Sequence, residues 1–303
     1  MTTFITILVN NVLPAFVVMA AGVLLDRTLH VDKKTLSRTA IYMLTPCLVF
    51  SSIVQSDVEP AQFGLMILFV LVITGVMCAI AMAVGHLLRW PKRTIDALVL
   101  SVAFVNAGNY GLSIIQFTFG MTALELAAVY FVTTKLTGNS VAAFFAARGS
   151  HSARQALLQV FRLPGLYAFA LAILLRSANL SVPDIILKPS SLIGSASVPI
   201  MLLMLGIQLS QTHVAKRYKQ VSVAVLLRLA VGPLVAFGLA PIMGLQGLAR
   251  QVAIAESSTP TAVSSALMAI EFDADADFVS STIFVSTLLS SVTMSIILAT
   301  LAA

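Results

Sequence analysis

Long apolar stretches follow one another along almost the whole chain, with short connections between them. Ten of these stretches are long enough to cross the hydrocarbon core of a bilayer as helices. Only 10% of the 303 residues are charged, whereas a soluble domain carries about 25%, and the mean hydropathy is +1.00. We therefore expect an all-α integral membrane protein. The ten predicted spans are residues 3–25, 37–55, 63–88, 95–118, 122–147, 156–176, 186–210, 220–243, 249–270 and 278–301.

Lys and Arg residues are concentrated in alternate connections. With the N-terminus outside, the cytoplasmic connections contain 13 of them and the outer connections contain 3. Because Lys and Arg favour the cytoplasmic side, both termini are predicted outside and the connection Arg148–Arg154 inside. These loops, facing anionic lipid, account for the net charge of +6 without nucleic acid. The predicted location is the cell membrane (cytoplasmic or inner membrane), in which the chain is a multi-pass protein embedded in the lipid bilayer.

Short matches relate the two halves of the chain. Leu13–Pro14 recurs at Leu163–Pro164, TPCLVFSSIVQS (45–56) resembles VPIMLLMLGIQLS (198–210), and FVTTKLT (131–137) resembles FVSTLLS (284–290). All three offsets are close to 150 residues. Five spans per half would place the second half upside down, and inverted repeats are typical of secondary transporters. We predict two five-helix repeats, residues 1–148 and 155–303.

Two of the predicted spans are interrupted at corresponding positions. FVNAGNYGLS (104–113) places two glycines inside the fourth span, and a shift of 150 residues from Asn106–Gly111 leads to Glu256–Thr261, which contains Pro260. Glycine permits unusual backbone angles and proline breaks a helix. Paired breaks of this kind predict a transporter's binding site. The alternative is that one or both are surface turns, although neither has the charged flanks that surface turns normally carry.

A broken helix pair creates two electrostatic poles. The second half-helices, expected to begin near Leu112 and Ala262, present N–H groups that attract an anion. The first half-helices, expected to end near Asn106 and Glu256, present carbonyl groups that attract a cation. Polar side chains surround both poles. The predicted substrate-binding residues are Asn106, Gly108, Asn109, Tyr110, Gly111, Ser257, Thr259, Pro260, Thr261, Lys135 and Asn139.

Ionisable residues at membrane depth are costly and usually functional. Glu256 and Lys135 are the deepest pair predicted, and Asn139 lies one turn beyond Lys135 on the same helix face. Lys135 is expected either to pair with Glu256 as a tethered cation or to contact an anionic substrate. The alternative is an ion pair that only fixes helix packing. Arg228 is nearer to the end of its span and is expected to extend to the interface.

The motifs NAGNYGLSI (106–114) and ESSTPTAVSSALMAIEF (256–272) resemble prokaryotic members of the auxin efflux carrier family, which are related to the PIN-type auxin carriers. The resemblance covers essentially the whole chain. It implies the ten-helix fold of bile-acid symporters and sodium/proton antiporters, with two broken crossover helices. It also implies small organic anions as substrates, and a homodimer contact on spans one, two, six and seven. The chain lacks the long central loop of many plant carriers, and glycines replace proline in its first break.

The leading hypothesis is a secondary transporter that moves a small organic anion, a mono- or dicarboxylate or an auxin-like compound, by alternating access at the crossover. Alternatives are a sodium- or proton-coupled exchanger or symporter using Glu256, and a membrane-embedded sensor without transport. The sequence contains neither HExxH nor GxSxG, so no enzymatic activity is predicted. No cofactor and no metal site are predicted either.

Overall fold

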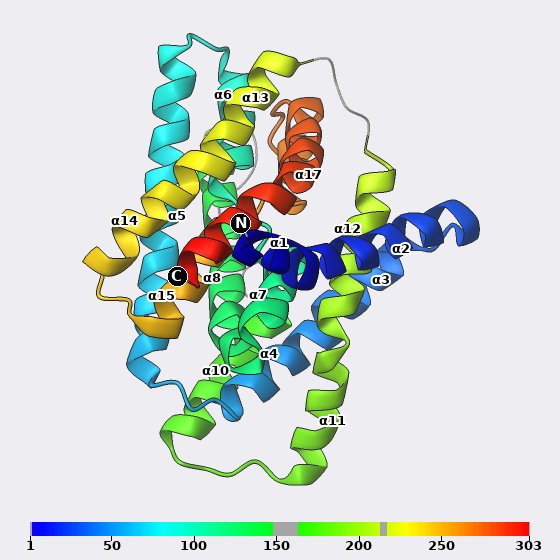
Figure 1. Ribbon diagram of the computed structural model, residues 1–303, viewed down its shortest axis with the longest axis vertical. Helices are drawn as coiled ribbons and strands as arrows, with labels where there is room; N and C mark the ends of the chain where they lie inside the picture. The colour runs from blue at the N-terminus through cyan, green and yellow to red at the C-terminus, as the bar shows by residue number, and fades with distance from the viewer. Residues whose placement is uncertain (1, 148–162, 213–216, 303) are drawn as a thin grey trace.

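The computed structural model describes residues 2–147, 163–212 and 217–302, with the side chains of Thr2, Pro60 and residues 139–147 left out of the description. Regular structure in these ranges is helical apart from one isolated β-bridge. In the first half, the helices and π-helical turns (η) are α1 (Thr2–Ile7), η1 (Leu8–Val12), α2 (Leu13–Leu29), α3 (Lys33–Thr39), η2 (Ala40–Leu44), α4 (Thr45–Val54), α5 (Pro60–Leu87), α6 (Lys92–Ala103), η3 (Ala107–Gly111), α7 (Leu112–Phe119) and α8 (Met121–Ala147) (Figure 1).

In the second half, several of the helices follow one another directly, as in the first. Their bounds are α10 (Pro164–Ser177), α11 (Asp184–Ser195), α12 (Ser197–Ser210), α13 (Tyr218–Leu226), η4 (Leu227–Val231), α14 (Gly232–Ile242), α15 (Gly247–Ser257), α16 (Ser264–Glu271) and α17 (Ala276–Leu301).

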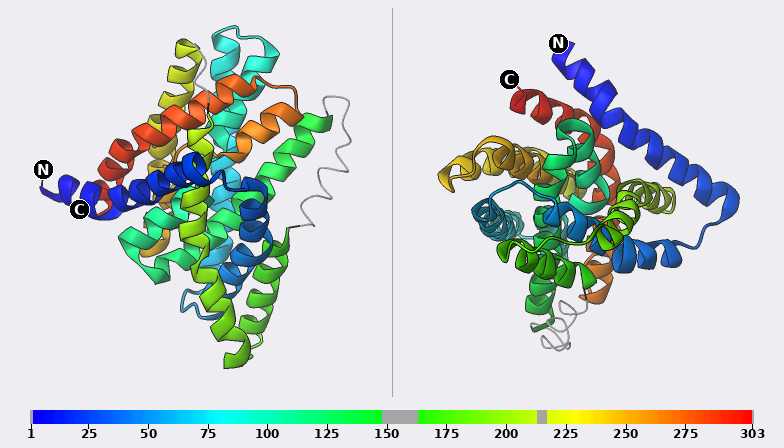
Figure 2. Two further views of the ribbon diagram at one scale, coloured as in Figure 1. Left: turned by 90° about the vertical axis from the view of Figure 1, so that its right-hand side faces the viewer. Right: turned by 90° about the horizontal axis from the view of Figure 1, so that it is seen from below.

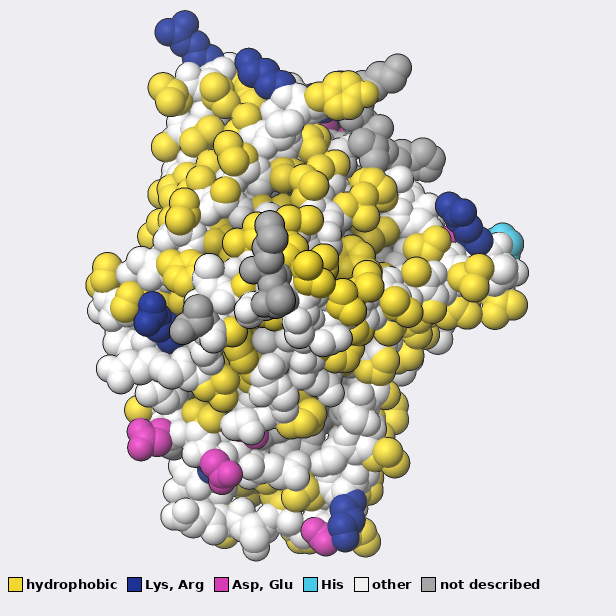
Figure 3. Space-filling view, in the orientation of Figure 1, with side chains coloured by type: hydrophobic (Ala, Val, Ile, Leu, Met, Phe, Trp, Pro, Cys, Tyr) yellow, Lys and Arg dark blue, Asp and Glu magenta, His cyan; other side chains and the backbone are white. Residues whose placement is uncertain are grey.

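Six continuous helical segments of the described chain are long and apolar enough to cross a membrane, and Pro164–Ser177 is a shorter apolar helix. Helix is also found in each of the ten predicted spans, although residues 156–162 and the connection Arg148–Arg154 lie outside the described residues. On the face shown in Figure 3, hydrophobic side chains cover most of the surface, and charged side chains lie toward the ends and margins. These features are those of a multi-pass membrane protein.

The first and last helices of the chain lie side by side, α1 against α17. The two termini are accordingly close together in all three views (Figures 1 and 2). Neighbouring termini agree with an even number of membrane crossings, which would place both ends on the same side of the bilayer.

Helices α2 and α12, which come from different halves, make the most extensive contact between elements. Two glycines permit it. A Cβ added to Gly22 would clash with the carbonyl group of Leu203, and one added to Gly206 would clash with that of Met19. Small residues that let two backbones approach are characteristic of helix pairs in membranes, where close packing replaces the hydrophobic effect as the driving force.

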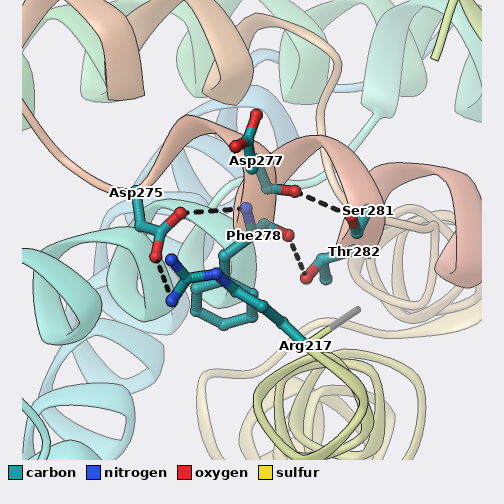
Figure 4. A network of polar contacts seen from close by, with 6 residues as sticks. All are labelled: Arg217, Asp275, Asp277, Phe278, Ser281 and Thr282. Carbon is teal, nitrogen blue, oxygen red and sulfur yellow. Dashed lines mark hydrogen bonds and ion pairs between the residues drawn. The ribbon is translucent and has the colours of Figure 1, made fainter. Parts of the chain in front are cut away.

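Side chains of Arg217 and Asp275 fix the start of α17 (Figure 4). Asp275 Oδ1 accepts a hydrogen bond from the Phe278 amide at 3.2 Å, which caps the helix. Its Oδ2 lies 2.7 Å from an Arg217 guanidinium nitrogen, in an ion pair that joins the residue preceding α13 to the start of α17. Within the helix, Thr282 and Ser281 donate to the carbonyl groups of Phe278 and Asp277.

Candidate functional site

The two interrupted helices meet at their breaks. After α6 the chain is extended through Phe104–Asn106, and after α15 it unwinds through Thr259–Ala262. Val105 and Thr261 form an antiparallel β-bridge: the Asn106 amide donates to the Pro260 carbonyl at 2.8 Å, and the Ala262 amide donates to that of Phe104 at 2.9 Å. Each break thus supplies hydrogen-bond partners for the other. Non-helical backbone at membrane depth is stable only when satisfied in this way. The two breaks are thus in direct backbone contact, and this contact between them is called the crossover below.

Arg228 joins the ends of both first half-helices. Its guanidinium donates to the carbonyl of Val102 in α6 at 2.7 Å and also to that of Ser257 in α15. The side chain is only 1% exposed, and a Cβ at Gly232, one turn further along the helix, would crowd the guanidinium. A cation is stabilised at helix C-termini by the unpaired carbonyl groups. The expectation that Arg228 extends to the interface is therefore wrong, because two carbonyl groups inside the protein hold it.

Polar residues of the second break bond within the protein. Thr261 Oγ1 donates to the Ser101 carbonyl at 2.7 Å, and its amide donates to Ser286 Oγ at 3.2 Å. Thr259 Oγ1 donates to the Glu256 carbonyl at 2.8 Å. Ser257 Oγ is 3.0 Å from the Tyr130 hydroxyl. These side chains hold the unwound backbone in shape.

A cavity of about 410 Å³ lies against one side of the crossover. That volume is in the range of small-molecule sites. The wall is mainly apolar, and its charged side chains in the described chain are Lys135 and Glu271. The lining residues are Ile41, Thr45, Phe104, Val105, Asn106, Gly108, Asn109, Phe131, Val132, Thr134, Lys135, Leu136, Gly138, Leu163, Pro164, Gly165, Leu166, Ala262, Val263, Ser264, Leu267, Met268 and Glu271.

Four of the residues predicted from the sequence line this cavity: Asn106, Gly108, Asn109 and Lys135. Two helix N-termini lie there as well. The helical stretch of η3 and α7 begins at Ala107, beside Gly108, and α16 begins at Ser264, another lining residue. The positive ends of two helix dipoles therefore meet one lysine ammonium and two amide side chains at the cavity, an arrangement suited to a carboxylate.

Six predicted residues do not line the cavity: Tyr110, Gly111, Ser257, Thr259, Pro260 and Thr261. Tyr110 is fully buried and packs edge-on against Phe16, with ring centroids 6.2 Å apart. Gly111 leaves room for the Glu256 carboxyl group, with which an added Cβ would overlap. Tyr110 and Gly111 lie in the helical turn η3 and not at the break itself. Ser257, Thr259 and Thr261 make hydrogen bonds to partners within the protein. The Asn139 side chain lies outside the described residues.

The predicted ion pair between Glu256 and Lys135 is not formed. Lys135 Nζ lies 5.6 Å from the centre of the Phe131 ring and its side chain is exposed in the cavity wall. Glu256 is fully buried and does not line this cavity, and both carboxyl oxygens lack a hydrogen-bond partner in the described protein. Lys135 also does not cap the half-helix carbonyl groups, because Arg228 occupies that position. No group of three or more metal-ligating side chains is found in the described ranges.

Phe131, Thr134 and Gly138 line the cavity but were not predicted. The sequence did carry a signal for them, because residues 131, 134, 135 and 138 share one face of α8 at helical spacing. A functional Lys135 therefore implies that its neighbours three and four positions away also face the site. The start of α10, which contributes Leu163 and Pro164, had no comparable signal.

Comparison with known proteins identifies the family of the chain. The model of the family described as "Membrane transport protein", an auxin efflux carrier-like family, matches residues 7–149 and 148–298. The chain belongs to this family. An uncharacterized transporter of Methanothermobacter thermautotrophicus is 28% identical over 291 residues, covering 93% of this chain and 92% of that protein. An uncharacterized transporter of Methanocaldococcus jannaschii is 26% identical over 271 residues, covering 85% and 86%. The resemblance of the two motifs to the auxin efflux carrier family is thus confirmed, and the protein is a membrane transport protein.

Proposed function

We propose that this transporter is a secondary carrier of a small organic anion and that the anion binds in the cavity beside the crossover. The proposal includes ten spans in two inverted repeats of five, both termini outside, and alternating access. The apolar body of the anion would contact Phe104 and Phe131, and its carboxylate would be bound by Lys135 and the amides of Asn106 and Asn109. The crossover residues Pro260 and Thr261, which do not line the cavity, would hold the backbone next to the site in its unwound shape.

The observation that carries this proposal is the convergence of positive groups on one cavity. The first N–H groups of η3 and of α16 lie at the wall that also contains Lys135. A cationic ligand would meet repulsion from all three, whereas an anion would be stabilised by each. Glu271, at the far end of α16, lies away from the break and next to the segment predicted to face the cytoplasm, so we assign the cavity to the inward-open state.

The guanidinium of Arg228 is a cation that belongs to the protein itself, and its position favours transport with little dependence on sodium. The half-helix carbonyl ends would attract a sodium ion if they were free, but Arg228 already donates to one carbonyl from each half-helix. We therefore expect the anion to move without a sodium ion bound between the half-helices. The sodium-dependent alternative is favoured if uptake collapses when choline replaces sodium at fixed pH and voltage.

Uptake into proteoliposomes tests the function. Purified protein is reconstituted and supplied in turn with radiolabelled malate, malonate and indole-3-acetate, with the voltage set by a potassium gradient and valinomycin. We expect saturable uptake of at least one probe, reduced about tenfold or more in Lys135→Met. Lys188→Met, which removes an exposed lysine of α11 that does not line the cavity, is the matched control and should transport as the wild type does.

Two outcomes contradict the proposal. Tight binding of a probe without flux would indicate a sensor. Uptake by Lys135→Met at the rate of the wild type would show that Lys135 does not bind the transported anion.

A further inference from the structure

The carboxyl group of Glu256 is buried and forms no hydrogen bond that would stabilise the crossover. Its exposed fraction is 0%, and neither carboxyl oxygen has a hydrogen-bond partner in the described protein. Neighbouring polar groups of the second break are all engaged with backbone or hydroxyl partners. An ionised carboxylate without a partner in such a place costs several kcal/mol or more. These surroundings therefore favour the uncharged acid over the carboxylate.

The backbone opposite Glu256 leaves space for its carboxyl group. Gly111 lies directly against the Glu256 carboxyl, and any larger residue there would displace it. The group thus lies between the end of the first half-helix α15 and the start of the second half-helix α7, behind the crossover and away from the cavity that contains Lys135. An acid placed between two half-helices moves with them whenever they move.

The contacts around Glu256 favour a proton over a metal ion as its partner. A sodium ion needs several oxygen ligands and a cavity of its own size. Of the two described cavities, neither is lined by Glu256, and the smaller, of about 10 Å³ beside Arg228, holds at most about one water molecule. The carbonyl groups that could have bound a cation accept hydrogen bonds from Arg228 instead.

Few ionisable groups face Glu256 from the helices packed against α15. Tyr130 of α8 is within electrostatic range of both Glu256 and Arg228, and Tyr110 of η3 precedes Gly111. Helices α7 and α14 have no titratable side chain. The titratable side chains of α5 and α17, none of which is a hydrogen-bond partner of Glu256, are Cys78, His86 and Asp277.

From this placement we propose that Glu256 carries a proton across the membrane together with the transported anion. The carboxylate takes up one proton from water on one side, crosses as the neutral acid, and releases that proton to water on the other side. One monoanion and one proton then cross per cycle with no net charge. This inference rests on the proposed function, because it names the ion that accompanies the anion.

Coupling is measured in the same proteoliposomes, with the voltage held at zero and a pH-sensitive dye inside. For one-to-one coupling, an inward gradient of one pH unit should drive about tenfold accumulation of the transported probe, and the dye should report acidification on addition of that probe. Glu256→Gln should lose both effects while retaining exchange of internal for external probe. Glu125→Gln, which removes a carboxyl group on α8 outside the cavity lining, should behave as the wild type.

The outcomes separate the two proposals. If no probe is taken up or exchanged by the wild type, the proposed function fails. If the wild type transports without a response to the pH gradient, or if Glu256→Gln still accumulates the probe, proton coupling through Glu256 is wrong. Infrared spectra of substrate-free protein give a second measurement independent of transport. The protonated-carboxyl band should be smaller in Glu256→Gln than in the wild type, and identical bands would overturn the inference.

Discussion

At the scale of single residues, Arg228 has the most demanding role. Its guanidinium binds carbonyl groups from two helices that are far apart in the sequence, and it does so while 1% exposed. Arginine suits this position because its planar fork presents several donors at fixed angles, which the single ammonium of a lysine does not. The side chain therefore acts as a permanent link between the two halves.

Replacement of Arg228 by methionine tests this link. The carbonyl groups of Val102 and Ser257 would lose their donor, and each buried group left without a partner costs about 1–3 kcal/mol. We expect Arg228→Met to lower the free energy of unfolding by about 2–6 kcal/mol and Arg228→Lys to have a smaller effect. Thermal unfolding in detergent measures the change, with the exposed Arg250→Met as control. Equal stability of Arg228→Met and the wild type would contradict the assigned role.

At the scale of elements, the two interrupted helices depend on residues that prevent a continuous helix. Pro260 has no N–H group, and its carbonyl accepts the hydrogen bond from Asn106. Asn109 lies on the other side of the crossing, in the cavity wall. One residue thus shapes the break and the other faces the proposed substrate.

Changes at both positions should reduce transport without unfolding the protein. In Pro260→Ala the new N–H group favours continuation of α15 at the expense of the bridge, and in Asn109→Ala an amide is lost from the cavity. We expect both variants to insert normally and to show at least a several-fold loss of probe uptake at matched expression. Thr300→Ala, near the end of α17, serves as control. Undiminished flux in either variant would show that its residue has no part in the site.

The sequence predicted where these breaks occur but not what each side chain does there. Glycine, proline and an abrupt change in polarity are local signals, so the approximate places of both interruptions could be found. The first was placed a few residues too late, because the non-helical backbone lies at Phe104–Asn106 and Ala107–Gly111, with both glycines, is already helical. The direction of Tyr110 toward Phe16, or of Arg228 toward Val102, depends on contacts between distant helices, which leave no local signal. Depth within a span was therefore a poor guide to the position of Arg228.

At the scale of the whole molecule, adjacent termini and alternating basic loops predict one topology. Helices α1 and α17 lie side by side, and the positive-inside rule predicts that the connection Arg148–Arg154 lies in the cytoplasm. Reporter fusions test this arrangement. An enzyme that is active only outside the cytoplasm should be active when fused to either terminus, and one that is active only inside should be active when inserted after Arg148. The reverse pattern would show that the orientation is wrong.

The bridge between Val105 and Thr261 also has a consequence for biogenesis. The two residues are about 150 positions apart, and at ~5–20 residues per second the ribosome needs on the order of 10–30 s to synthesise the intervening chain. During that time the extended segment after α6 is without the amide and carbonyl groups that will later satisfy it. Because bare backbone is not tolerated in lipid, α6 and the segment after it must remain beside water, the insertion machinery or neighbouring helices until α15 and the segment after it have been synthesised. Neither half of the transporter can complete its own hydrogen bonding alone.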